Sequence, residues 1–157
     1  MEGKSVRQSQ VITTELVIPN DTNQLGNLLG GTLMHWIDIV AAIAAQRHCG
    51  RVCVTASVDE INFHYPIKVG EIVTLQASVN RAFRTSMEIG VVVNAFGLRE
   101  GTSRRANNAY LTFVAVDEKG KPVEVPSVVP ETDNERRRYD EAMSRRQLRL
   151  RRRISVS

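Results

Sequence analysis

One segment of the chain has helical periodicity, and most of the rest is rich in β-branched and aromatic residues. From about Gly31 to His48, apolar residues recur at intervals of three and four, and the intervening positions are also largely apolar. This pattern predicts a helix that is buried nearly all round. Arg47, His48 and Gly50 then place cations in the last turn and a glycine after it, which is typical of a helix end.

Runs of β-branched and aromatic residues on either side of this segment predict strands. The first run, Gln10 to Ile18, ends at Pro19, and turn-forming residues then continue to Gly26. Four longer runs follow the helix, and each is expected to form a strand: Val52 to Phe63, Ile72 to Phe83, Ser86 to Phe96 and Ala106 to Asp117. The polar stretch from Gly97 to Arg104 predicts a loop.

The predicted order is therefore strand, buried helix, four long strands and, from Glu131 to about Arg152, a second helix. One apolar helix beside a meander of antiparallel strands indicates an α+β fold in which a long sheet wraps around the helix. A sheet and a single helix leave apolar surface uncovered, so we expect the chain to self-associate.

Charge separates the chain into two parts. Its 157 residues have a formal net charge of +4, but residues 1–130 hold 12 basic and 12 acidic side chains, whereas residues 131–157 hold nine Arg and five acids. A nucleic-acid-binding fold carries its basic residues on the folded face that meets phosphate, so a nucleic-acid partner is not expected. We divide the chain into a domain of residues 1–130 and an Arg-rich, solvated helical tail of residues 131–157.

The sequence gives no indication of membrane insertion or of a metal site. No apolar run approaches the length of a membrane span, and the polar N-terminus lacks the apolar core of a signal peptide. We therefore expect a cytoplasmic protein. Cys49 and Cys53 are expected to be free, partly buried thiols, and the three histidines do not complete a zinc site at a usual spacing.

Asp38 is the main candidate for chemistry. It lies in the middle of the most apolar segment, where an unpaired carboxylate costs of the order of several kcal/mol. Its helical neighbours Met34, Ala41 and Ala42 cannot satisfy it. We interpret Asp38 as a general base or nucleophile in an apolar pocket. The alternative is that it pairs with an Arg or Lys of the sheet, or emerges at a solvated edge.

The residues before the predicted helix, Asn27 to Thr32, form a second candidate. Gly30 and Gly31 would let a ligand approach the backbone, and the free N–H groups and helix dipole there suit a developing negative charge on oxygen. A plain turn requirement would explain the glycines equally well. Asn27 is either the helix cap or a polar group that orients substrate or water.

Spacing suggests how the two candidates could cooperate. Gly31 and Asp38 are seven residues apart, which is about 10 Å along one helix. One carbonyl cannot easily reach both through hydrogen bonds of about 3 Å. If both act on the same atom, they should come from two subunits, and the site should lie at a dimer interface.

Other polar residues have ordinary explanations. His35 and His64 are best explained as packing or hydrogen-bonding residues. A turn between two strands holds a cluster of polar residues, Arg81, Arg84, Thr85 and Ser86. This turn is either a solvated hairpin tip or a binding site for a phosphate ligand. No Gly-x-Ser-x-Gly elbow and no glycine-rich nucleotide motif is present.

Several blocks in fixed order resemble the hotdog-fold acyl-CoA thioesterases, in particular the brain-type acyl-CoA hydrolase and its single-domain bacterial relatives. The blocks are Asn27 to Met34, Trp36 to Asp38, Arg47 to Cys49, Val54 to Asp59, Ile61 to Phe63, Ser86 to Ile89, Gly120 to Pro122 and Val129 to Thr132. The resemblance as a whole is taken to extend over about nine tenths of the chain. This order of blocks is far more specific than any one of them.

The resemblance implies a hotdog fold, a continuous sheet across two subunits with active sites at their interface, and assembly into a trimer of dimers. It matches the catalytic carboxylate to Asp38 and the asparagine that acts from the other subunit to Asn27. It implies hydrolysis of a fatty acyl-CoA to free acid and CoA, without metal or organic cofactor. The expected substrate-binding residues are Gly30, Gly31, Thr32, Ser57, Arg84, Thr85 and Ser86.

Two questions stay open at this level. A non-catalytic acyl-CoA-binding or sensing protein could use the same fold, although such a protein would not need Asp38. The tail from Ala142 to Ser157 holds six Arg and no acid. If the chain is a thioesterase, the CoA phosphates are a partner for this end, with RNA or membrane contact as weaker options.

Overall fold

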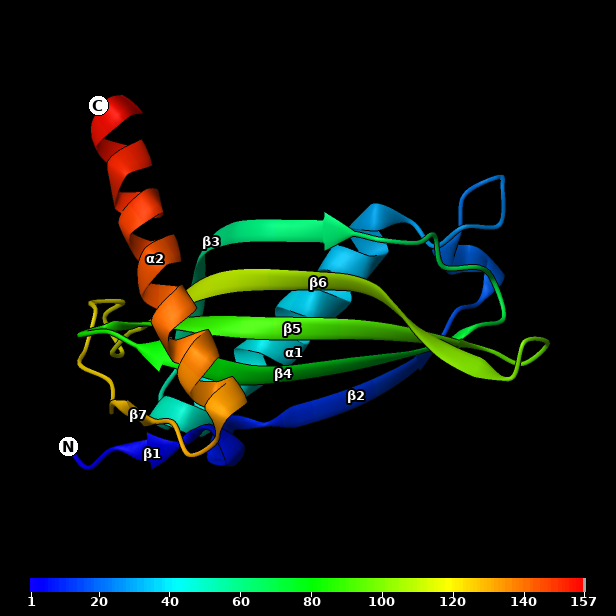
Figure 1. The fold of residues 1–157 in the computed structure, drawn as a ribbon. Helices are drawn as coiled ribbons and strands as arrows, with labels where there is room; N and C mark the ends of the chain where they lie inside the picture. Colours follow the sequence, from blue (N-terminus) through cyan, green and yellow to red (C-terminus); the bar gives the residue numbers. More distant parts are fainter. Residues whose placement is uncertain (157) are drawn as a thin grey trace.

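The computed structural model describes residues 1–156, with the side chains of residues 1–154. A five-stranded antiparallel sheet in the order β2-β4-β5-β6-β3 curves around helix α1, and helix α2 crosses its opposite face (Figure 1). The elements are β2 (Val11–Leu16), α1 (Gly30–Cys49), β3 (Cys53–Phe63), β4 (Ile72–Ala82), β5 (Ser86–Gly97), β6 (Thr102–Ala115) and α2 (Asp133–Val156). The predicted α+β hotdog arrangement is confirmed.

The N-terminus adds short elements that the sequence did not reveal. Strand β1 (Lys4–Ser5) pairs in parallel with β7 (Val128–Val129), and two single-turn 3-10 helices cover Val6–Ser9 and Pro19–Asp21. Elements of two to four residues are too short to show periodicity. The pairing of β1 with β7 ties the N-terminus to the segment that precedes α2.

Strand β6 begins earlier than expected. Thr102 pairs with Gly97 and Arg105 with Asn94, so the predicted loop from Gly97 to Arg104 is wrong for Gly97 and for its last three residues. The turn is tight because Gly101 adopts a positive φ of 68°. Polar side chains at this solvated end of the hairpin concealed the strand.

Helix α1 buries one side against the sheet. Its contact side includes Leu33, Ile37, Val40 and Ala44, all at most 5% exposed. On the other side His35 is exposed and Ile39 is 44% exposed. The prediction of a helix buried nearly all round is therefore wrong for the single chain, because only one face of α1 meets the sheet.

Helix α2 is docked on the sheet rather than solvated along its whole length. Ala142 is 1% exposed, and Arg145 forms two hydrogen bonds of 2.7 and 2.9 Å with the buried carboxylate of Glu88 on β5. Arg145 also lies over the ring of Tyr110, 3.7 Å from its centroid. The expectation of a solvated tail is wrong for this side of the helix, because the polar outer face of the sheet supplies partners for its arginines.

Candidate active site

Asp38 lies half-exposed on α1 and is held by a hydroxyl group from β3. The Thr55 Oγ1 donates a hydrogen bond of 2.7 Å to the Asp38 Oδ1. No Arg or Lys among the described side chains forms a salt bridge with Asp38. The carboxylate is therefore oriented without being neutralised, which leaves it able to accept a proton or to attack an electrophile.

Thr55 was not identified from the sequence, although it lies in one of the blocks that carry the resemblance. Position 55 is 17 residues from Asp38, and no local spacing rule predicts a contact between a helix and the following strand. Alternation along β3 could have indicated it only if the register of the strand were known.

Ser57, which is expected to bind substrate, contacts Asp59 rather than Asp38 within this chain. The pairing of β3 with β6 is irregular between Thr55 and Ser57, where a bulge interrupts the alternation of faces. Ser57 Oγ donates a 2.5 Å hydrogen bond to Asp59, whose carboxylate also accepts from Thr112 and from Arg149 of α2. Ser57 therefore belongs to the network under α2.

The two glycines at the start of α1 are open to their surroundings. Gly30 and Gly31 are exposed, neither has a positive φ, and a Cβ added to either would have no atom within 4 Å. A plain turn requirement therefore does not explain them within this chain. Thr32 follows them, half-buried, in the first turn of the helix. The backbone N–H groups of this turn are accessible to an incoming ligand.

Asn27 is not the helix cap. The N-cap residue of α1 is Leu29, which makes no side-chain capping bond. The Asn27 Oδ1 is buried and has no hydrogen-bond partner in the described part of the chain. Asn27 Oδ1 is thus the one buried side-chain acceptor in this loop that lacks a donor.

Asn23, four residues earlier, organises the same loop. Its Oδ1 accepts hydrogen bonds from the backbone N–H of Leu25 at 2.9 Å and of Asn27 at 3.1 Å. These two bonds fix the plane of the Asn23 amide. The Nδ2 donor of this exposed side chain is then held in one direction without a partner of its own among the described residues.

An ion pair between Arg104 and Glu71 lies next to the loop that precedes α1. Arg104 of β6 donates to both Glu71 carboxylate oxygens, at 2.7 and 3.1 Å, and to the Pro66 carbonyl oxygen at 2.9 Å. Burial raises the pKa of Glu71, but the hydrogen bonds from Arg104 and from the Lys68 N–H outweigh it, and the pKa lies below its usual value. The Ile67 carbonyl, next to Pro66, accepts a hydrogen bond from the Leu28 N–H. The Arg104–Glu71 ion pair therefore helps to hold the loop that precedes α1.

Arg84, Thr85 and Ser86 lie at the other end of the sheet within one chain. Arg84 and Thr85 lie in the turn between β4 and β5, and Ser86 begins β5, whereas the glycine end of α1 lies beside the segment that leads into β4 (Figure 1). The 11 residues of β4 separate the two ends by more than about 30 Å. Arg84 is exposed, and at this distance the turn cannot reach the glycines of its own chain.

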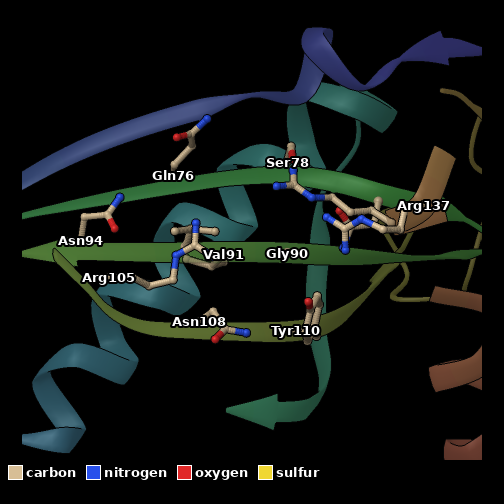
Figure 2. A pocket seen from close by; sticks show the side chains of 12 residues that line it. Gln76, Ser78, Gly90, Val91, Asn94, Arg105, Asn108, Tyr110 and Arg137 are labelled. Atoms are coloured by element: carbon tan, nitrogen blue, oxygen red, sulfur yellow. The ribbon is translucent and has the colours of Figure 1, made fainter. Parts of the chain in front are cut away.

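The described surface has a polar hollow on the sheet face opposite α1. It has a volume of about 260 Å³ and is lined by β4, β5, β6 and α2, with Arg105 near Val91 and Arg137 entering from α2 (Figure 2). None of the predicted site residues lines it. No group of three or more His, Cys, Asp or Glu among the described residues could hold a metal ion, and no described helix is long and apolar enough to cross a membrane.

Comparison with known proteins decides the family. Residues 25–101 match the model of the thioesterase superfamily. The chain is 43% identical over 144 residues to a Bacillus subtilis protein named as an uncharacterized acyl-CoA thioester hydrolase, with 92% of this chain and 84% of that protein covered. This chain belongs to the thioesterase superfamily.

Solved structures of other superfamily members are similar to this chain over nearly its whole length. An acyl-CoA hydrolase from Staphylococcus aureus in complex with butyryl coenzyme A, coenzyme A and coenzyme A disulfide is 42% identical, with a TM-score of 0.91 and coverage of 98% of this chain and 93% of that one. The same enzyme was solved with one aspartate, one asparagine or one threonine replaced by alanine. An apo-hexameric acyl-CoA thioesterase is 40% identical, with a TM-score of 0.93 and 97% of each chain covered.

Proposed function

We propose that this thioesterase-superfamily protein hydrolyses acyl-CoA thioesters, including fatty acyl-CoA, to free acid and CoA. The observation that carries the proposal is the Asp38 carboxylate, oriented by Thr55 on a helix whose glycine N-terminus is open. The similarity of the whole chain to a hydrolase solved with butyryl coenzyme A supports acyl-CoA as the substrate class. A protein that only binds or senses acyl-CoA would have no use for an oriented, unpaired carboxylate.

The mechanism that we propose needs water and this chain's own groups, without metal or organic cofactor. Backbone N–H groups at Gly30 and Gly31 stabilise the oxyanion that forms when the thioester carbonyl is attacked. Asp38 either removes a proton from the attacking water or attacks the carbonyl itself, which gives an anhydride that water then opens. The C–S bond breaks, CoA leaves as a thiolate, and the acid is released.

We further propose that each site is shared between two subunits. The Gly31 and Asp38 of one chain are about 10 Å apart along α1, too far for hydrogen bonds to the same carbonyl. The side of α1 that carries Ile39 is exposed in the single chain, as expected of a surface that a second subunit covers. The dimer is then the smallest active unit, and a trimer of dimers is supported by the hexameric relative.

The asparagine of the site is better assigned to Asn23 than to Asn27. In the Staphylococcus enzyme the substituted asparagine, aspartate and threonine are separated by 15 and 17 residues. In this chain Asn23, Asp38 and Thr55 have the same separations. Asn23 also presents an oriented Nδ2 donor, which would position the attacking water or the carbonyl oxygen.

Replacing Asn23 with aspartate separates these two assignments. The variant keeps an Oδ1 acceptor for the N–H groups of Leu25 and Asn27 but loses the Nδ2 donor, so we expect kcat to fall about 100-fold with little change in Tm. The comparison variant Asn27→Ala removes an Oδ1 that has no donor among the described residues, and should keep kcat within a few-fold. Thiol release from a panel of acyl-CoA chain lengths measures both, and the reverse ranking would restore Asn27 as the site asparagine.

Mixed dimers test whether the site is shared. Subunits carrying Asp38→Ala and Asn23→Ala, with different affinity tags, are co-expressed and purified through both tags. Each mixed dimer then has one site with both residues intact, and we expect about half of the wild-type activity per dimer. Neither variant alone should exceed a small residual rate.

The matched control places both substitutions in one subunit and pairs it with wild type. If the site is shared, each site of this mixed dimer lacks one residue, and the activity should be close to zero. Half of the wild-type activity in the control, with none in the complementing pair, would mean that each chain holds a complete site. Absence of thiol release from wild type with every acyl-CoA would leave only the binding protein.

A further inference from the structure

Two thiols meet at the turn that connects α1 to β3. Cys49 is the last residue of α1 and Cys53 the first of β3, and Gly50 between them adopts a left-handed φ of 67°. The turn brings the two sulfur atoms to 3.1 Å from each other. Both also lie near the Arg51 carbonyl oxygen, at 3.6 and 3.5 Å. The sequence predicts two free, partly buried thiols, but it does not predict that they are in contact.

The two cysteines differ in exposure. Cys49 is half-buried, so a small solute can reach it, whereas Cys53 is 9% exposed. A disulfide bond requires an S–S distance of about 2.05 Å, which the sulfurs can reach by moving about 1 Å closer. The turn therefore needs only a small adjustment to close.

We propose that Cys49 and Cys53 form a site of reversible two-electron oxidation by peroxides, which closes an intrachain disulfide across the α1–β3 turn. The Cys49 thiolate attacks one peroxide oxygen, the O–O bond breaks, and the departing oxygen takes a proton to leave as water or an alcohol. Cys49 is now a sulfenic acid. The Cys53 sulfur then attacks the Cys49 sulfur, and the proton of Cys53 leaves with the hydroxyl group as water.

The local environment assigns these two roles. The hydrogen bond from the Cys53 thiol stabilises a thiolate on Cys49 and lowers the pKa of Cys49, to which the positive charge of Lys4 on β1 also contributes. The same hydrogen bond and burial raise the pKa of Cys53. An accessible thiolate with a second thiol in contact is the arrangement of an attacking and a resolving cysteine. The inference does not depend on the proposed hydrolysis.

The test uses the full chain and dilute hydrogen peroxide. Trypsin cleaves after Arg51, between the two cysteines, so the peptide His48 to Arg51 stays attached to the peptide that begins at Val52 only through a disulfide. We expect this linked pair to appear after oxidation and to vanish with dithiothreitol. An interchain disulfide, or irreversible oxidation of either cysteine without the linked pair, would overturn the proposal.

Single variants test the order of the steps. In Cys53→Ser the sulfenic acid on Cys49 cannot be resolved, and dimedone should label Cys49. In Cys49→Ser, labelling of Cys53 should be at least about tenfold slower. Equal labelling of the two variants would contradict the assigned roles. Circular dichroism of each variant, compared with wild type, shows that both are folded when they are labelled.

Discussion

Replacing Asp38 with asparagine is expected to lower kcat for acyl-CoA hydrolysis by about 10² to 10⁴-fold. The amide cannot accept the proton of water at neutral pH and is a poor nucleophile, so both mechanisms lose their main group. The amide oxygen still accepts the hydrogen bond from Thr55, and the side chain is half-exposed, so Tm should change little. Initial rates of CoA release, with KM determined separately, measure the effect.

The matched control is Glu60→Gln, which removes an exposed carboxylate from β3 with the same change of charge and shape. Its kcat should stay within a few-fold of wild type. If Asp38→Asn is also within a few-fold, Asp38 is not the catalytic carboxylate. A loss of kcat accompanied by a large fall in Tm would mean that the carboxylate supports the fold.

Isotope incorporation provides a positive test for direct attack by Asp38. In a single turnover in heavy-oxygen water, a general base leads to label in the acid product alone. A covalent anhydride intermediate opened at the acyl carbon also puts label only in the product. If water opens it at the aspartyl carbon, the label enters Asp38, and a peptide containing residue 38 gains mass. Label in Asp38 therefore establishes attack by the carboxylate.

Replacing Arg145 with methionine is expected to lower the free energy of unfolding by about 3 kcal/mol or more, because it leaves a buried carboxylate without its cation. The Glu88 side chain is 2% exposed and that of Arg145 is 18% exposed. Asn80 Nδ2 still donates a 2.9 Å hydrogen bond to Glu88, which places the effect at the lower end of the range for broken buried pairs. Methionine removes both the ion pair with Glu88 and the guanidinium contact with the Tyr110 ring, so the measured change includes both.

Urea unfolding at one fixed protomer concentration measures this change, since oligomer formation otherwise shifts the apparent stability. Arg151→Met, at an exposed position of the same helix, should change stability by less than about 0.5 kcal/mol. The double variant Glu88→Gln with Arg145→Met should recover part of the loss, because no charge is then buried alone. Equal effects at positions 145 and 151 would mean that the ion pair does not hold α2.

The helices and strands with a regular hydrophobic periodicity could be predicted from the sequence, but the contacts between them could not. Helix α1 ends at Cys49 near the predicted end, and Gly50 adopts the left-handed conformation that the glycine stop requires. Asp38 could be identified from the sequence, because a single charged residue within an apolar helical segment is unusual whatever its contacts are. Thr55 could not be found, because its contact with Asp38 depends on how β3 crosses the helix.

The outer face of the sheet illustrates the same limit. Alternation predicts polar residues there, but it does not say that Glu88 and Asp59 would meet arginines 57 and 90 residues later in the chain. The bulge after Thr55 also turned Ser57 to this face, and a one-residue irregularity has no signature in the spacing of residue types. Within one chain Ser57 therefore contacts Asp59 in the network under α2, and its role in substrate binding stays a prediction.

The pairing of Glu88 with Arg145 has a consequence for synthesis of the protein on the ribosome. Strand β5 is translated 57 residues before its cation, so a nascent sheet carries an uncompensated carboxylate until α2 emerges. The first strand likewise waits for the last, because Lys4 pairs with Val128. The native packing of β1 and β5 is therefore completed only after β7 and α2 have left the exit tunnel.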